Sequence, residues 1–188
     1  MADFDSAVRW ARFDPRKTIG RRPDAELPFL DDEGPAGGPL LLDTCVYIDQ
    51  VQGHTPAAVD DVIATRQAHH STIALQELMH TVGVLDPKDR RTPTAVAEIR
   101  GLIRSMLPHR IFTPDSDTLG RAALLAGMIC RLQGYGADRR FRALADCAMF
   151  LQGQKLGLTV LTANIGDFDR LLQLVPSGRV LFYRRTRG

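Results

Sequence analysis

The sequence has little cysteine: Cys45, Cys130 and Cys147 are the three in 188 residues. They are too few and too far apart for a disulfide framework. None forms the C-x-x-C pair that is typical of a structural zinc site. We therefore expect a reducing compartment, in which each cysteine acts as a small buried apolar side chain.

Long apolar runs and several common cofactor motifs are also missing. No run approaches the roughly 18 apolar residues that a membrane-spanning helix needs, and the first residues lack the apolar segment of a signal peptide. We therefore predict a cytoplasmic protein without a membrane partner. There is no G-x-x-x-x-G-K, no G-x-G-x-x-G and no H-E-x-x-H, which disfavours those nucleotide-binding and zinc-enzyme classes.

Excess charge of one sign is absent as well. The chain has 24 Lys and Arg against 22 Asp and Glu, a formal net charge of +2. This balance excludes a strongly cationic nucleic-acid binder but leaves a local basic patch open. A hydrophobic fraction of 44% is ordinary for a globular protein, and the length suits one domain with an extension.

Composition changes near residue 40. Residues 1–39 form a Pro/Gly-rich N-terminal arm with five of the eleven prolines and an excess of acids, whereas residues 40–188 carry an excess of basic side chains. The spacing of Phe4, Val8 and Trp10 permits one short helix, after which the prolines disfavour regular structure. The arm either lies on the main domain or serves as a partner-binding or dimer-swapped segment.

From residue 40 onward, short apolar runs alternate with helical patterns. This alternation predicts an α/β fold, a three-layer sandwich with a mostly parallel central sheet. Strands are expected at 40–42, 110–112, 158–161 and 180–183. Helices are expected at 44–51, 56–68, 72–84, 93–107, 116–132, 138–156 and 165–174.

Polar side chains follow two of these strands. Asp43 and Thr44 come directly after the first apolar run, and Thr162, Asn164 and Asp167 follow the run at 158–161. Ligands of parallel α/β sheets bind beyond the carboxyl ends of the strands, so both exits are candidate positions for a site. Either set could instead cap the helix that comes next.

Two further acids lie on predicted helices. Glu77 stands among apolar residues of the helix at 72–84, and Asp146 lies off the apolar stripe of the helix at 138–156. Without a shared site, Glu77 would be a solvated helix position, and Asp146 would form an i, i+4 ion pair with Arg142.

Together, the four acids can converge on one cleft. At a separation of about 5 Å and an effective dielectric constant of about 20, each pair of carboxylates repels by about 3 kcal/mol. Such a cluster stays ionised only beside a cation, and hard oxygen ligands without Cys or His favour Mg²⁺ or Mn²⁺. The metal ligands are then Asp43, Glu77, Asp146 and Asp167, and a metal-activated water can attack a phosphodiester.

This arrangement resembles the PIN-domain nucleases, and among them the VapC-type toxins of toxin–antitoxin pairs. The resemblance covers residues 40–184 and rests on three segments in order: LLDTCVYID, HHSTIALQELMH and RALADCAMFLQGQKLGLTVLTANIGDFDRL. The second segment resembles the short second strand of the family and the helix that carries its second acid. The sequence departs from the family where Asn164 replaces an Asp of some relatives, where Cys147, Met149 and Phe150 replace smaller residues, and in the first forty residues.

The resemblance implies a PIN-like fold and a Mg²⁺- or Mn²⁺-dependent endoribonuclease. Thr162 and Asn164 would then orient a ligand or the scissile phosphate beside the four acids. It also implies an RNA substrate, a cognate antitoxin and a homodimer. Two basic clusters could hold RNA phosphates or be solvated faces: Arg139, Arg140 and Arg142, and Arg184, Arg185 and Arg187.

Two other interpretations compete with a nuclease. A haloacid-dehalogenase-like phosphatase is disfavoured, because Cys45 stands where that class has a second Asp. A catalytically silent PIN-like module that binds RNA or serves as a scaffold is the main alternative.

Overall fold

The protein is described by a computed structural model. It describes residues 5, 8–9, 12, 18–34 and 36–186. The helix predicted around Phe4, Val8 and Trp10, and the last arginine of the C-terminal cluster, lie largely or wholly outside these residues.

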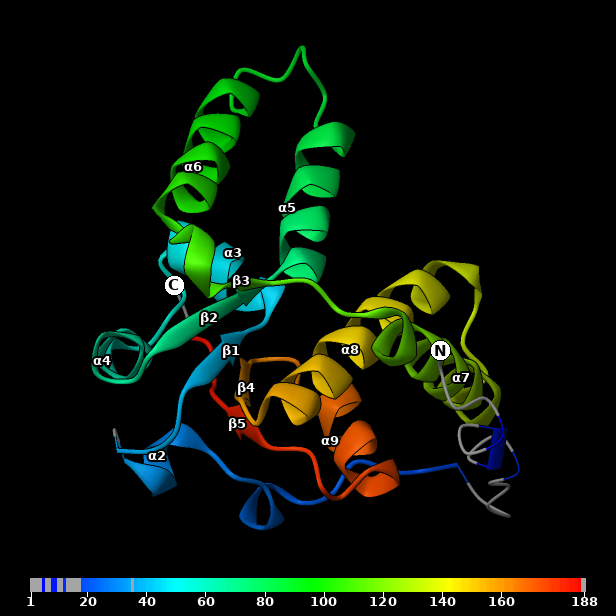
Figure 1. Cartoon of the computed structure of the whole chain (residues 1–188). Helices are drawn as coiled ribbons and strands as arrows, with labels where there is room; N and C mark the ends of the chain where they lie inside the picture. The colour runs from blue at the N-terminus through cyan, green and yellow to red at the C-terminus, as the bar shows by residue number, and fades with distance from the viewer. Residues whose placement is uncertain (1–4, 6–7, 10–11, 13–17, 35, 187–188) are drawn as a thin grey trace.

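A five-stranded sheet in the order β3-β2-β1-β4-β5 forms the centre of the molecule (Figure 1). The strands are β1 (Leu40–Leu42), β2 (Ala68–Ser71), β3 (Ile111–Phe112), β4 (Thr159–Thr162) and β5 (Val180–Phe182). Every pairing among these strands is parallel. The predicted α/β sandwich with a mostly parallel sheet is therefore confirmed.

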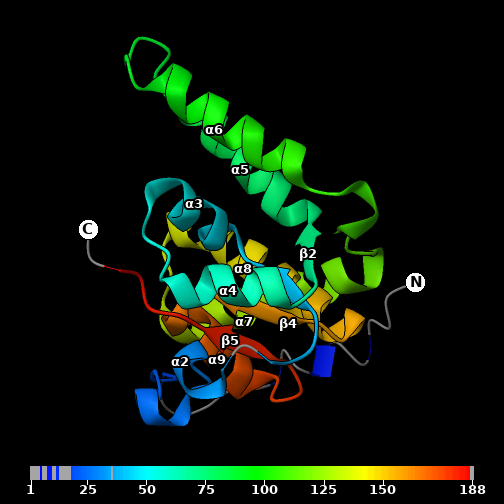
Figure 2. The same ribbon diagram turned by 90° about the vertical axis from the view of Figure 1, so that its left-hand side faces the viewer.

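Helices cover both faces of the sheet (Figures 1 and 2). They are α2 (Leu30–Glu33), α3 (Thr44–Gln52), α4 (Ala57–Thr65), α5 (Thr72–Val84), α6 (Thr92–Ser105), α7 (Ser116–Gln133), α8 (Ala137–Leu156) and α9 (Ile165–Leu174), with 3₁₀ turns η1 (Asp24–Glu26) and η2 (Pro108–Arg110). Of the helices that the structure describes, none has the length and apolar character to cross a membrane.

The predicted helix over 56–68 is wrong at its end. Helix α4 stops at Thr65, Arg66 adopts an extended conformation, and a strand begins at Ala68. Ala68 pairs with Leu40 of β1, while His70 pairs with Ile111 of β3. The local pattern did not reveal this strand, because β2 is fixed by two neighbours that are distant in sequence.

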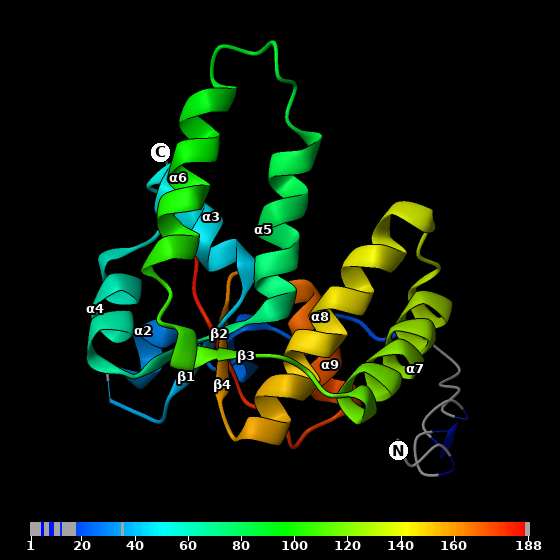
Figure 3. The same cartoon turned by 45° about the horizontal axis from the view of Figure 1, so that its top comes forward.

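Helices α5 and α6 run side by side and project beyond the rest of the fold (Figures 1 and 3). The apolar core lies lower, between the sheet and its covering helices. Its centre is the strand residues Leu40, Leu41, Val160, Leu161 and Leu181, all fully buried. Strands β1 and β5 are wholly apolar and buried, as expected of a parallel sheet covered on both sides.

The segment 18–34 lies along α9 and the β5 edge of the sheet. Phe29 forms a parallel bridge with Phe182, and Phe182 donates its backbone N–H to the carbonyl of Pro28. Leu27, Phe29 and Leu30 are buried in the main core. The prediction of no regular structure here is wrong for η1 and α2: Leu30 of α2 is buried in the core, and Asp24 of η1 forms an ion pair with Arg184 after β5. The division at residue 39 stays a prediction.

Candidate functional site

An open cleft of about 700 Å³ lies beyond the carboxyl ends of β1 and β4. All four predicted acids line it, as does Asn164. The strands bring two of the acids close, because β1 and β4 are paired in register and Leu42 lies opposite Leu161. The residue after each strand therefore emerges at the same edge of the sheet. The other lining residues are Thr44, Cys45, Ile48, Arg142, Ala163, Ile165, Gly166 and Arg185.

Asp43 is the buried floor of this cleft. It is 4% exposed and occupies the N-cap of α3, where its Oδ1 accepts a hydrogen bond from the N–H of Thr44 at 2.7 Å. Its Oδ2 accepts from the hydroxyl of Thr162 at 2.6 Å and from the thiol of Cys45 at 3.1 Å. Burial raises the pKa of Asp43, and these hydrogen bonds offset part of that rise. Asp43 thus both occupies the N-cap of α3 and lines the cleft.

Glu77 reaches the cleft from the second turn of α5. The hydroxyl of Thr44 donates to Glu77 Oε2 at 2.5 Å, which connects the start of α3 to α5. Burial raises the pKa of Glu77, the charge of Asp43 adds to the rise, and the charge of Arg142 lowers it. Glu77 is therefore half-buried beside another acid, and the interpretation of a solvated helix position is wrong.

Asp146 comes from the middle of α8. Its Oδ2 accepts a hydrogen bond from the side-chain amide of Asn164 at 3.1 Å. Burial raises the pKa of Asp146 well above its usual value, and the charges of the other three acids raise it further, Asp43 most strongly. Among the described residues Asp146 has no ion pair with Arg142. The alternative of a structural i, i+4 ion pair between Arg142 and Asp146 is therefore wrong. The charge of Arg142 instead lowers the pKa of Glu77.

Asp167 lies in the first turn of α9 and differs from the other three. Its Oδ1 accepts from the hydroxyl of Tyr135 at 2.6 Å and from Arg170 Nη1 at 3.0 Å. Arg170 also donates to the hydroxyl of Tyr135. This acid therefore has a cationic partner one turn along its own helix.

Thr162 and Asn164 take separate places. Thr162 is fully buried beneath the cleft, where it donates to Asp43 and accepts the N–H of Asn164 at 2.9 Å. Asn164 occupies the N-cap of α9 but makes no side-chain capping bond, because its amide turns to Asp146. The alternative that its side chain only caps α9 is therefore wrong.

Sequence reasoning missed several side chains of this region. Tyr135 and Arg170 contact Asp167, while Tyr183 and Asp49 lie next to Cys45. Only Arg170 carried a local signal, because it stands three residues after Asp167 on one helix. The others come from loops or helix faces whose contacts depend on the tertiary fold.

The donor set fits a hard divalent cation. Among the described residues, no three Asp, Glu, His or Cys side chains lie close enough to hold one ion between them. Mg²⁺ commonly takes one or two protein carboxylates and keeps several waters, so the pair Asp43 and Asp146 is sufficient. Both lie in the cleft, and neither has an ion pair with a basic side chain of the described chain.

Comparisons with known proteins identify the fold and go no further. No protein-family profile and no curated protein matches the chain. Among solved structures it is similar to VapBC2 from Rickettsia felis bound to a promoter DNA fragment, at 15% identity and a TM-score of 0.50, over 77% of this chain and 98% of the other. It is also similar to FitAcB from Neisseria gonorrhoeae, at 22% identity and a TM-score of 0.52, over 77% of this chain and 96% of the other.

A third similar structure is VapBC-5 from Mycobacterium tuberculosis, a member of the VapBC family of toxin–antitoxin systems. It has 17% identity and a TM-score of 0.50, over 78% of this chain and 100% of the other. At these identities the likeness concerns the backbone alone: the chain has the PIN-like α/β fold found in solved VapBC and FitAB complexes.

Proposed function

We propose that this protein is a Mg²⁺- or Mn²⁺-dependent endoribonuclease and the toxin of a toxin–antitoxin pair. One observation supports this most strongly. Asp43 and Asp146 line one cleft, the charge of Asp43 raises the pKa of Asp146, and no described basic side chain pairs with either. A pair of carboxylates in this setting is costly unless a cation lies between them.

The chain's own residues would divide the work. Asp43 and Asp146 would hold the ion directly, and Glu77 and Asp167 would hold its waters from the two sides of the cleft. A bound Mg²⁺ or Mn²⁺ would lower the pKa of a coordinated water and neutralise charge on the phosphodiester.

Two uncharged side chains would fix the geometry of the acids. Thr162 keeps Oδ2 of Asp43 in place by its hydrogen bond of 2.6 Å. Asn164 orients Asp146 in the same way from the start of α9. Thr162 ends β4 and Asn164 is the N-cap of α9, so both contacts come from the short junction between these two elements.

The partners follow from the same proposal. The substrate would be RNA, cut in single-stranded loops where bases are splayed out. The similar structures are VapBC and FitAB complexes, which favours an antitoxin protein as partner in the cytoplasm and a homodimeric toxin.

The test is cleavage of total RNA by the purified protein with Mg²⁺, Mn²⁺ or EDTA. We expect cleavage with either metal and none with EDTA or with Asp43→Asn. A variant that retains its melting temperature but cuts no RNA would assign the loss to the site. Wild-type protein that cuts no RNA with either metal would contradict the proposal.

A catalytically silent module that binds RNA or serves as a scaffold is the second candidate. The spacing of the acids favours it, since no three of the described ligand side chains are close enough to share one ion. It predicts RNA binding without cleavage and no change in melting temperature on addition of metal.

A further inference from the structure

The candidate cleft has an acidic floor, and its proposed substrate is a polyanion. Attraction for RNA must therefore come from basic groups at the rim. Of the residues that line the cleft, two are basic: Arg142 from α8 and Arg185 from the segment after β5. Arg142 lies one turn before Asp146, and its charge lowers the pKa of Glu77, so it already interacts with one of the acids of the cleft.

Arg185 is held differently. Its Nε donates to both carboxylate oxygens of Asp49 at 2.8 Å. Asp49 lies on α3 and is 1% exposed, whereas the side chain of Arg185 is 52% exposed. Both contacts use Nε, and Asp49 is its described ion-pair partner. The guanidinium is therefore anchored through Nε, its described hydrogen bonds do not use the two terminal nitrogens, and Arg185 lines the cleft.

A continuous set of contacts connects this anchor to the floor. The hydroxyl of Tyr183 donates to Asp49 Oδ2 at 2.7 Å and lies 3.9 Å from the thiol of Cys45. That thiol in turn donates to Asp43 Oδ2 at 3.1 Å. Asp49 is also close enough for its charge to raise the pKa of Asp43. Arg185 is thus placed against the same group of side chains as the first acid.

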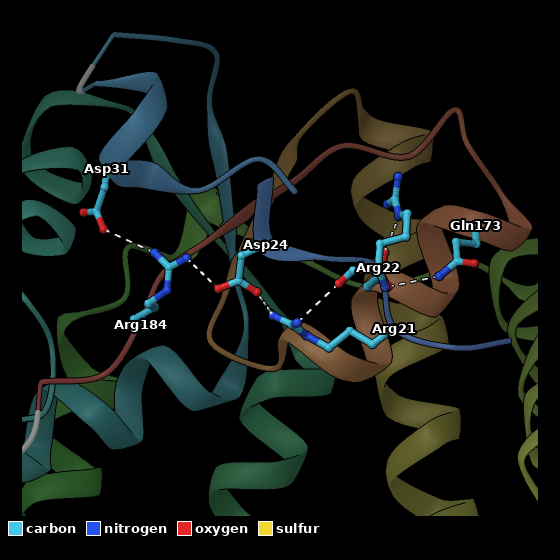
Figure 4. A network of polar contacts seen from close by, with 7 residues as sticks. Arg21, Arg22, Asp24, Asp31, Gln173 and Arg184 are labelled. Carbon is cyan, nitrogen blue, oxygen red and sulfur yellow. Dashed lines mark hydrogen bonds and ion pairs between the residues drawn. The ribbon is translucent and has the colours of Figure 1, made fainter. Parts of the chain in front are cut away.

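The backbone after β5 is fixed as well. The N–H of Thr186 donates to the carbonyl of His54 at 2.9 Å, just beyond α3. Arg184, one residue earlier, turns the other way. Its guanidinium lies 3.6 Å from the ring centroid of Phe29 and pairs with Asp24 and Asp31, as Figure 4 shows for the two acids. Adjacent arginines in an extended segment point to opposite sides.

We infer that Arg185 binds a backbone phosphate of the RNA strand in the cleft, with Asp49 as its positioning residue. The inference rests on the proposed function and assigns it a substrate contact. A guanidinium anchored through Nε can offer its two terminal nitrogens to a phosphate as a planar pair, and little conformational entropy is lost on binding.

The chain supplies a matched control in Arg184. Both arginines follow the same strand and carry the same charge, but only Arg185 lines the cleft. Arg185→Gln and Arg184→Gln therefore change net charge equally. A difference between them reports position in the fold and not overall electrostatics.

The experiment measures binding and cleavage separately. Binding of a fluorescein-labelled single-stranded oligoribonucleotide is followed by anisotropy in EDTA from 50 to 300 mM salt, and cleavage is measured with Mn²⁺. We expect Arg185→Gln to weaken binding about tenfold and to lower the slope of log affinity against log salt by about 0.7, one phosphate on a single strand. KM should rise similarly with kcat within about twofold, while Arg184→Gln stays near wild type.

Asp49→Asn tests the positioning role. The arginine charge remains, so the salt slope should stay near that of wild type while KM rises. Because Asp49 is buried, the melting temperature of each variant is recorded. Should Asp49→Asn unfold, Arg185→Lys gives a second test: it keeps the charge and the slope but loses the planar pair, and KM should rise.

The outcomes separate the two proposals. If wild type cuts RNA and Arg185→Gln behaves like Arg184→Gln in binding and KM, the role of Arg185 is wrong and the nuclease stands. If Arg185→Gln lowers kcat alone, the arginine does not bind substrate in the ground state and the inference is also wrong. If wild type neither binds nor cuts RNA, the proposed function fails and this inference with it.

Discussion

Two groups of buried or half-buried acids occur in this molecule, and their surroundings differ. On α9, Asp169 is fully buried and accepts hydrogen bonds from the Nε and the backbone N–H of Arg22 and from Gln173. Asp49 likewise accepts hydrogen bonds from the Nε of Arg185 and the hydroxyl of Tyr183. In the cleft, Asp43 and Asp146 have hydroxyl, thiol and amide donors, and no described basic partner.

The difference shows which acids stabilise the fold and which do not. Removing a buried carboxylate that has its own arginine leaves that arginine and the other hydrogen-bond donors without their acceptor, which lowers stability. A carboxylate beside other carboxylates opposes folding until a cation binds. The following predictions test this distinction, ordered by the size of their effect on the free energy of unfolding.

The largest effect is expected at Asp169. In Asp169→Ala, the guanidinium and N–H of Arg22 lose their acceptor, as does the amide of Gln173. Arg22 is partly exposed, which reduces the cost, so we expect a loss of about 2–4 kcal/mol. Urea unfolding followed by circular dichroism measures it. The exposed Asp60 is the control, where Ala should change stability by less than about 0.5 kcal/mol; equal losses would contradict the distinction.

Divalent cations should stabilise the protein through the cleft. At a metal concentration ten times the Kd, we expect a gain of about 1.4 kcal/mol. Differential scanning fluorimetry with Mg²⁺ and Mn²⁺ measures the rise in melting temperature. The rise should be much smaller in Asp146→Asn, because one of the two proposed ligands is lost. A rise of the same size in both proteins would locate the cation elsewhere.

Asp146→Asn should abolish RNA cleavage but leave metal-free stability unchanged or raised. The pKa of Asp146 is raised in the fold, so the native state binds more protons than the unfolded chain, and wild-type stability falls as pH rises above about 4 through the raised pKa. The gain from Asn should therefore appear above pH 4 and reach about 1.4 kcal/mol for each unit by which the pKa is raised. A variant that is less stable than wild type at neutral pH would show that Asp146 has a structural partner.

The smallest effect is expected at Tyr135. Tyr135→Phe removes the hydroxyl that donates to Asp167 and accepts from Arg170. Because Arg170 still pairs with Asp167, we expect a loss of about 0.5–1.5 kcal/mol and a modest decrease in cleavage rate. Chemical unfolding and initial-rate measurements on the same RNA provide the values. Complete inactivation would mean that Tyr135 itself takes part in the reaction.

Much of the fold could be predicted from local patterns. The apolar runs at 40–42 and 180–183 and the helix at 165–174 are marked by the residues themselves and by the breaks around them. The polar residues at the strand exits could be found for the same reason, since the position of a strand end fixes where its next side chain emerges. No local pattern marks β2, because its neighbours in the sheet come from distant parts of the sequence; only the resemblance of HHSTIALQELMH to the PIN-domain nucleases implied a strand there.

The state of each acid was harder to predict than its place. Sequence spacing suggested an ion pair between Arg142 and Asp146. In the structure the charge of Arg142 lowers the pKa of Glu77, and Asp146 accepts a hydrogen bond from Asn164. Likewise, nothing local indicates that Arg185 meets Asp49 across 136 positions, whereas Arg184 meets Asp24. Ion pairs between distant segments depend on side-chain directions that only the folded chain defines.

The bridge between Phe29 and Phe182 has a consequence for solubility. An edge strand such as β5 has unpaired backbone N–H and C=O groups, to which a strand of another chain can pair and so begin aggregation. Here the carbonyl of Pro28 receives the N–H of Phe182, and the ring of Phe29 packs against that of Phe182 with centroids 5.9 Å apart. A chain that lacks residues 1–29 would expose this edge together with an aromatic surface. We therefore expect it to precipitate at a lower protein concentration than the full chain.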